Sequence, residues 1–134
     1  MTDLELMQLA VQAREKSYSP YSRFKVGAAL LGKSGKVYLG CNVENAAYSP
    51  TNCAERTAVF KAVSEGETEF SAIAIVGGKG NELAQFCAPC GVCRQVLAEF
   101  CDKDFRLVLG APDNFRAYTF DEILPYSFGK QDLE

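Results

Sequence analysis

Apolar positions near the start of the chain repeat with the spacing of a helix. Asp3 and Glu5 place negative charge in what would be the first turn, where the positive end of a helix dipole favours it. The apolar residues that recur at intervals of three or four positions are Leu4, Met7, Ala10 and Val11. This spacing predicts a helix over residues 3–16.

Short apolar runs bounded by turn residues predict strands further along the chain. Gly32 to Gly35, with Lys33 and Ser34 between them, form the loop expected for a hairpin between the first two runs. A polar, turn-like stretch follows at residues 40–45. The five runs read as strands are 24–31, 36–39, 70–76, 106–109 and 115–120.

Two further helices are expected between these strands, at residues 53–64 and 91–100. Gly66 follows the first and Pro89 precedes the second, as helix ends and beginnings favour. Strands alternating with helices in this order predict a three-layer α/β/α sandwich with one mixed five-stranded sheet, in a single domain over residues 1–134. The crossovers around these two helices should make that part of the sheet parallel.

Composition limits the classes of function. Of the 134 residues, 48% are hydrophobic and 23% are charged, which is ordinary for a globular protein. The net charge of −3 disfavours binding to nucleic acid, and the absence of histidine excludes an imidazole base or ligand. No apolar run approaches the ~18 residues of a membrane span. The acidic start does not resemble a signal peptide, so we expect a cytoplasmic protein.

Six cysteines are the unusual feature of this composition. In a small secreted chain they would indicate disulfides, but in a reducing cytoplasm thiols are usually buried, catalytic or bound to metal. Cys53 and the pair Cys90 and Cys93 each lie at the start of an expected helix, where thiolates are favoured. Three such thiolates suit Zn²⁺ in a catalytic site, which keeps its fourth position open.

Cys87 leaves other interpretations of this cluster open. With Cys53, Cys90 and Cys93 it could form a closed four-cysteine zinc site. The spacing of Cys87, Cys90 and Cys93 also occurs in iron–sulfur proteins, although there a Cys-Pro normally follows and here the next cysteine is Cys101. A redox pair of Cys90 and Cys93 would leave Cys53 unused.

Glu55 adds chemistry to the thiols. It stands two positions after Cys53, from where a carboxylate can reach a water beside the metal and carry protons. Cys53-Ala54-Glu55 followed by Pro89-Cys90-Gly91-Val92-Cys93 matches the three-cysteine form of the signature of zinc nucleobase deaminases.

Over nearly its whole length the chain resembles the small, homotetrameric, zinc-dependent cytidine deaminases. The motifs that carry the resemblance, in order, are Ser22-Arg23-Phe24-Lys25-Val26-Gly27-Ala28-Ala29, Gly40-Cys41-Asn42-Val43-Glu44-Asn45-Ala46, Cys53-Ala54-Glu55-Arg56, Pro89-Cys90-Gly91-Val92-Cys93-Arg94-Gln95 and Leu124-Pro125-Tyr126-Ser127-Phe128. The resemblance implies hydrolytic deamination of cytidine and deoxycytidine to uridine and deoxyuridine, in pyrimidine salvage.

The resemblance also implies roles for the residues of the metal centre. One Zn²⁺ per subunit would be held by Cys53, Cys90 and Cys93 and would lower the pKa of water. Glu55 would take a proton from that water, pass it to the cytosine ring and help the amine leave as ammonia. Arg56 would hydrogen-bond the ligand sulfurs and offset part of their negative charge.

Substrate contacts follow from the same resemblance. Asn42 and Glu44 would hydrogen-bond a ribose hydroxyl, the Ala54 backbone would read the cytosine edge, and Phe24 would contact the base. Phe128 would reach the site of a neighbouring subunit, which would then be complete only in the homotetramer.

Two alternatives remain at the level of the sequence. The substrate could be a modified cytosine nucleoside, although Asn42 and Glu44 favour an ordinary ribose. The chain could instead be a non-catalytic module around a closed four-cysteine zinc site, in which Glu55 would be dispensable. Cys87 lies outside the matched motif and is expected to be a bystander, whereas Arg94 has no role that the sequence assigns.

Overall fold

The computed structural model of the chain describes residues 1–84 and 86–134. Its elements follow the expected order of helices and strands. In chain order they are α1 (Asp3–Arg14), β1 (Phe24–Gly32), β2 (Val37–Cys41), α2 (Ala54–Ser64), β3 (Phe70–Lys79), α3 (Gly91–Phe100), β4 (Arg106–Ala111), β5 (Asn114–Thr119), α4 (Phe120–Ile123) and the 3₁₀ helix η1 (Lys130–Asp132).

The strands form one mixed sheet in the order β2-β1-β3-β4-β5. β1 is antiparallel to both β2 and β3, and β4 is antiparallel to β5. The crossover through α3 joins β3 to its parallel neighbour β4, as expected. The crossover through α2 joins β2 to β3, which are not neighbours because β1 lies between them. Parallel pairing is therefore limited to β3 and β4.

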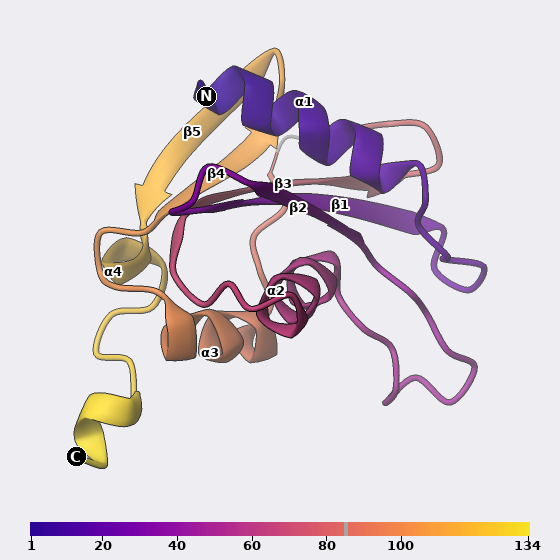
Figure 1. Cartoon of the computed structure of the whole chain (residues 1–134). Helices are drawn as coiled ribbons and strands as arrows, with labels where there is room; N and C mark the ends of the chain where they lie inside the picture. The colour runs from indigo at the N-terminus through magenta and orange to yellow at the C-terminus, as the bar shows by residue number, and fades with distance from the viewer. Residues whose placement is uncertain (85) are drawn as a thin grey trace.

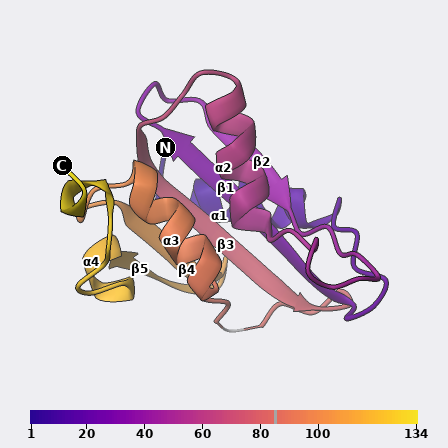
Figure 2. The same ribbon diagram turned by 90° about the horizontal axis from the view of Figure 1, so that it is seen from below.

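Helices cover both faces of the sheet. Figure 1 shows α1 on one face and both α2 and α3 on the other, and Figure 2 shows α2 and α3 side by side. Two buried clusters match these layers: one contains Leu6, Met7 and Ala10 of α1, and the other contains Ala58 of α2 and Leu97 of α3. The three-layer α/β/α sandwich is confirmed. Among the described residues, no helix is long and apolar enough to cross a bilayer.

Two strands continue past the points where the sequence predicts turns. β2 extends through Gly40 to Cys41, and β3 extends through Gly77 and Gly78 to Lys79. In both places the glycine lies against another part of the chain that approaches too closely for a side chain. These glycines are therefore strand residues at close contacts, and the expected turn-like stretch at 40–45 begins later, after Cys41.

Gly40 sets how closely α2 can approach the sheet. A Cβ at this position would lie 2.5 Å from both the Ala54 carbonyl oxygen and the Ala58 nitrogen. We expect Gly40→Ala to lower the free energy of unfolding by about 1–3 kcal/mol, because the backbone of α2 must move to admit the methyl group. Denaturant unfolding of the zinc-loaded protein measures this change.

Gly91→Ala is the matched control for this prediction. Gly91 begins α3, and apart from its two chain neighbours and the nearby backbone of its own helix, no described atom lies within 4 Å of the position that its Cβ would take. Its replacement is expected to leave the unfolding free energy unchanged or slightly higher, since alanine favours the helix. Equal stability of the Gly40→Ala and Gly91→Ala proteins would contradict the close packing of α2.

Candidate functional site

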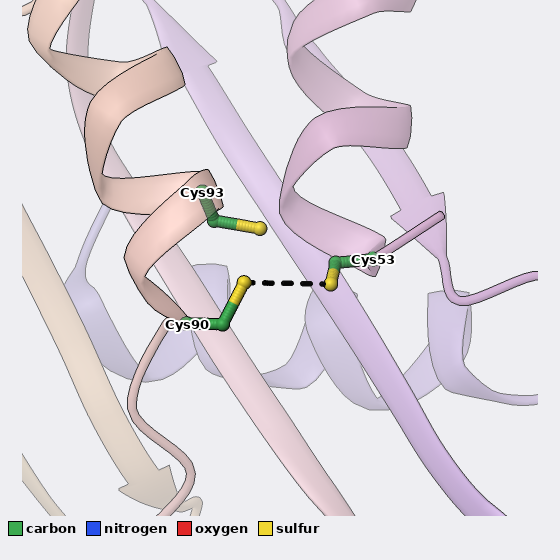
Figure 3. A group of neighbouring side chains, drawn as sticks. All are labelled: Cys53, Cys90 and Cys93. Atoms are coloured by element: carbon green, nitrogen blue, oxygen red, sulfur yellow. Dashed lines mark hydrogen bonds between the residues drawn. The ribbon is translucent and has the colours of Figure 1, made fainter. Parts of the chain in front are cut away.

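Three thiols from the starts of two helices meet on the α2 and α3 side of the sheet (Figure 3). Cys53 precedes the first residue of α2, Cys90 precedes the first residue of α3, and Cys93 lies in the first turn of α3. Their sulfur atoms all lie within 4.8 Å of one another, and those of Cys53 and Cys90 are 3.8 Å apart. The sequence-predicted ligands are thus brought together by the fold.

Both helices begin at a cysteine in extended conformation. Within the described chain, neither the Cys53 nor the Cys90 thiol caps the backbone of its own helix. Both sulfurs are therefore available to a ligand, while the unpaired N–H groups of two helix starts favour negative charge near them. Local structure prepares the cluster for thiolates.

Without an ion, the electrostatics of the cluster favour one ionised sulfur, that of Cys53, whereas hydrogen bonding with Cys53 and burial raise the pKa of Cys93. Hydrogen bonding with Cys93, and then with Arg56, lowers the pKa of the Cys53 thiol to about 5. The Arg56 Nη2 atom donates to Cys53 Sγ at 3.3 Å, and this contact raises the pKa of Arg56. In the described part of the chain, Arg56 Nε is a buried donor that has no hydrogen-bond partner. A cation among sulfurs offsets the charge that several thiolates accumulate.

The donor set fits zinc. Three soft sulfur ligands on a rigid scaffold suit Zn²⁺ and leave a coordination position for a reactant. Cys87 is not in the cluster of sulfurs that could hold an ion, and burial raises the pKa of its thiol to about 11. Its sulfur lies instead near the backbone of Gly77 in β3. A closed four-cysteine site does not match this arrangement.

The other sulfur chemistries fit the geometry less well. An iron–sulfur centre on Cys87, Cys90 and Cys93 would require Cys87 in the cluster, where the described structure has Cys53 instead. A redox pair of Cys90 and Cys93 would not account for Cys53 beside both of them. The grouping of thiols is that of a three-ligand metal centre.

Glu55 lies in the first turn of α2, next to this cluster. Its side chain is buried, with 4% of the residue exposed. Burial, with a smaller contribution from the Cys53 charge, raises the pKa of the Glu55 carboxyl to about 7. Such a carboxyl can accept and release a proton near neutral pH.

The Asn42 side chain hydrogen-bonds the backbone of β1 at Phe24 and at Val26. The Asn42 side chain donates to the Phe24 carbonyl oxygen at 2.8 Å and accepts from the Val26 N–H at 2.9 Å. Asn42 follows β2, and Phe24 begins β1. The Asn42 amide, expected to contact the ribose, is therefore hydrogen-bonded to the strand that carries Phe24, which is expected to contact the base.

Glu44 is held by the segment that precedes β1. Its carboxylate accepts hydrogen bonds from the N–H groups of Tyr21 and Ser22, at 3.0 and 3.1 Å. The Ser22 hydroxyl donates to the other carboxylate oxygen. The Ser22 hydroxyl, followed by the backbone donors, lowers the pKa of Glu44. Glu44 is thus an ionised acceptor with a fixed orientation.

The remaining sequence-predicted residues occupy different environments. Ala54 is fully buried at the start of α2, whereas Phe24 is 37% exposed. Phe128 is 59% exposed in the C-terminal segment, which extends away from the sheet in Figure 1. Gln95 of α3 donates to the Phe128 carbonyl oxygen at 2.9 Å, so this segment is attached to the helix that also carries Cys93.

The structure gives Arg94 a contact that the sequence did not assign. Its Nε donates to the Pro89 carbonyl oxygen at 2.8 Å, and its Nη1 donates to the Ile123 carbonyl oxygen at 2.6 Å. Arg94 therefore ties the residue before Cys90 to the end of α4. Sequence reasoning also missed Ser17 and Ser22 as partners of Asn42 and Glu44, although Ser22 begins one of the matched motifs.

Comparisons with known proteins agree with this geometry. The family model described as the cytidine and deoxycytidylate deaminase zinc-binding region matches residues 1–109. A cytidine deaminase of Sporosarcina psychrophila is 48% identical over 130 residues, which cover 96% of this chain and 93% of that protein. A cytidine deaminase of Halalkalibacterium halodurans is 50% identical over 129 residues, covering 96% of this chain and 95% of that protein. The crystal structure of cytidine deaminase from Burkholderia pseudomallei superimposes with a TM-score of 0.88 at 47% identity, covering 96% of this chain and all of that one.

Proposed function

Because the chain belongs to the cytidine and deoxycytidylate deaminase family, we propose that it catalyses the zinc-dependent hydrolytic deamination of cytidine and deoxycytidine. The products are uridine or deoxyuridine and ammonia. The observation that carries this proposal is the cluster of three thiols beside the buried carboxyl of Glu55. A metal centre alone could be structural, but a buried carboxyl next to it supplies a proton carrier.

Cys53, Cys90 and Cys93 hold the zinc ion in this proposal, one per subunit. When bound, Zn²⁺ supplies the Lewis acidity that makes water a nucleophile near neutral pH. The starts of α2 and α3 and the guanidinium of Arg56 offset part of the charge of the three thiolates, as the 3.3 Å contact between Arg56 Nη2 and Cys53 Sγ supports.

Glu55 carries the protons. Water adds to C4 of the cytosine ring and gives a proton to the Glu55 carboxylate, which passes it to the ring. Glu55 then takes the second proton, from the hydroxyl now on C4, and gives it to the exocyclic nitrogen; the bond between C4 and that nitrogen breaks as the C4 carbonyl forms, and ammonia departs. The raised pKa of the buried Glu55 carboxyl supports this role, because a general acid and base works best when its pKa lies near the working pH.

Contacts to the substrate divide between base and sugar. Phe24 contacts the cytosine ring and the Ala54 backbone reads its edge, while Asn42 and Glu44 hydrogen-bond a ribose hydroxyl. Phe128 completes the site of a neighbouring subunit in a homotetramer. The exposure of Phe24 and Phe128 in the single chain supports both assignments, because an aromatic ring in a packed core could not reach a ligand or a partner.

The wider setting follows from the substrate class. We assign the chain, as one domain over residues 1–134, to pyrimidine salvage in the cytoplasm. Its net charge of −3 supports a free nucleoside as the substrate over a polynucleotide, whose phosphates favour a basic groove.

The test of the function is the loss of cytidine absorbance on addition of the purified, zinc-loaded protein. We expect conversion of cytidine and of deoxycytidine, and no conversion after zinc is removed with a chelator. A zinc-loaded, correctly assembled protein that converts neither nucleoside would overturn the proposed substrate, and a modified cytosine nucleoside would be tested next.

A further inference from the structure

The segment between α1 and β1 supports both side chains of the proposed sugar contact. The Tyr18 N–H donates to the Asn42 carbonyl oxygen at 3.0 Å, and the Glu44 N–H donates to the Tyr18 carbonyl oxygen at 2.8 Å. Asn42 and Glu44 are therefore fixed to this segment through their backbones. Its serines, Ser17 and Ser22, hold their side chains as well.

Ser22 leaves Glu44 with little remaining hydrogen-bonding capacity. One carboxylate oxygen accepts from two backbone N–H groups, and the other accepts from the Ser22 hydroxyl. A carboxylate has about four acceptor positions. Three are used within the described chain, so one remains, on the oxygen that Ser22 holds. Beside it lies a surface hollow of about 410 Å³ whose lining includes Ser22, Glu44 and Tyr48.

Ser17 limits Asn42 in the same way. The Ser17 hydroxyl donates to Asn42 Oδ1 at 2.5 Å, and the Val26 N–H donates to the same oxygen. Asn42 Nδ2 donates one hydrogen to the Phe24 carbonyl oxygen. An amide nitrogen carries two hydrogens. Asn42 thus keeps one N–H without a partner among the described residues, and its orientation is fixed by groups on both sides.

One remaining donor and one remaining acceptor complement a single hydroxyl group, which can accept one hydrogen bond and donate another. Given the proposed deamination of a nucleoside, on which this inference rests, we propose that Ser22 and Ser17 are positioning residues that restrict Asn42 and Glu44 to one sugar hydroxyl. The Ser22 hydroxyl also accepts from the Phe24 N–H at 3.0 Å. This one side chain therefore connects Glu44, the proposed sugar contact, to Phe24, the proposed base contact.

The experiment compares Ser22→Ala with the unmodified enzyme on cytidine, 2′-deoxycytidine and 3′-deoxycytidine. For nucleosides that carry the hydroxyl in question, we expect Ser22→Ala to raise KM about tenfold with kcat changed less than about twofold, because ground-state and transition-state binding weaken together. For the analogue that lacks this hydroxyl, the variant and the unmodified enzyme should have the same KM. Ser22→Thr, which keeps the hydroxyl, should restore the KM for cytidine.

Ser34→Ala is the matched control. The Ser34 N–H and hydroxyl donate to Glu67 at 3.0 and 2.7 Å, and its hydroxyl accepts from the Lys36 N–H at 3.2 Å. This repeats the pattern of Ser22, Glu44 and Phe24 in the turn between β1 and β2. Ser34→Ala should therefore match Ser22→Ala in any loss of thermal stability while leaving all three KM values unchanged.

The possible results separate this inference from the proposed function. If the unmodified, zinc-loaded enzyme deaminates none of the three nucleosides, the proposed function fails. If it is active but Ser22→Ala leaves KM unchanged, or raises it equally for all three, Ser22 does not select a hydroxyl and the inference is overturned. The inference is supported if the unmodified and Ser22→Ala enzymes have the same KM for one deoxy analogue and different KM values for the other two nucleosides.

Discussion

Glu55→Gln is expected to lower kcat for cytidine by about 10²- to 10⁴-fold, the range that general acid and base catalysis supplies. The amide has the shape of the carboxyl and fits its buried position, but it cannot take a proton from water or pass one to the cytosine ring. The three thiols of the metal centre are unchanged, so the zinc content should remain at that of the unmodified protein. Initial rates and metal analysis on the same preparation measure both quantities.

Glu99→Gln provides the control for this substitution. Glu99 is an exposed carboxylate on α3, and its replacement removes the same charge without touching the buried carboxyl. Its kcat should equal that of the unmodified enzyme. A Glu55→Gln enzyme with a kcat within a few-fold of the unmodified value would remove Glu55 from the central role.

Loss of one sulfur from the cluster is expected to cost the protein its metal. Cys93 is fully buried in the first turn of α3, within 4.8 Å of the other two sulfurs. Since changes to groups that only support a ligand cost about 10- to 100-fold in metal affinity, removal of a ligand in Cys93→Ala should cost more than about 100-fold. Metal analysis after gel filtration, with deamination rates on the same sample, should show both zinc and activity lost.

Cys87→Ala is the control for Cys93→Ala, because it shows whether removal of any nearby thiol is enough to release zinc. Cys87 is half-buried and has a raised pKa, but it lies outside the cluster. The Cys87→Ala protein should retain zinc and activity, and X-ray absorption of the unmodified protein should show three sulfur ligands. Four sulfur ligands, or release of zinc by Cys87→Ala, would favour the closed four-cysteine site.

Local patterns predicted most of the fold. The apolar spacing and Pro89 located α3 at Gly91–Phe100, because a helix is set by residues close together in sequence. The predicted ends of β2 and β3 were wrong because they rest on the glycines that follow residues 39 and 76, and glycine is also common in turns. Whether Gly40 ends a strand or admits a helix depends on what packs against it, and here that is α2. Nothing within a few residues of Gly40 contains this information.

The same distinction applies to the site. The order and spacing of Cys53, Glu55, Cys90 and Cys93 were sufficient to predict the cluster, since the thiols lie at the starts of two helices. The supporting hydrogen bonds were not predictable, because they join distant segments. Arg14 is an example: it fits the helical spacing of α1, yet its side chain donates to the carbonyl oxygen of residue 78 near the end of β3 and to those of residues 80 and 82 in the loop that follows.

The distance in sequence between the thiols has a consequence for the stability of the protein and for its amount in a cell. Cys53 and Cys90 are 37 positions apart, and all of β3 lies between them. An ion that joins them closes a long loop of the chain, and it binds the folded state in preference to the unfolded one. Stability should therefore rise with free zinc. In a cell short of the metal, more copies of the chain would be open to proteases, and the amount of enzyme would follow the supply of zinc.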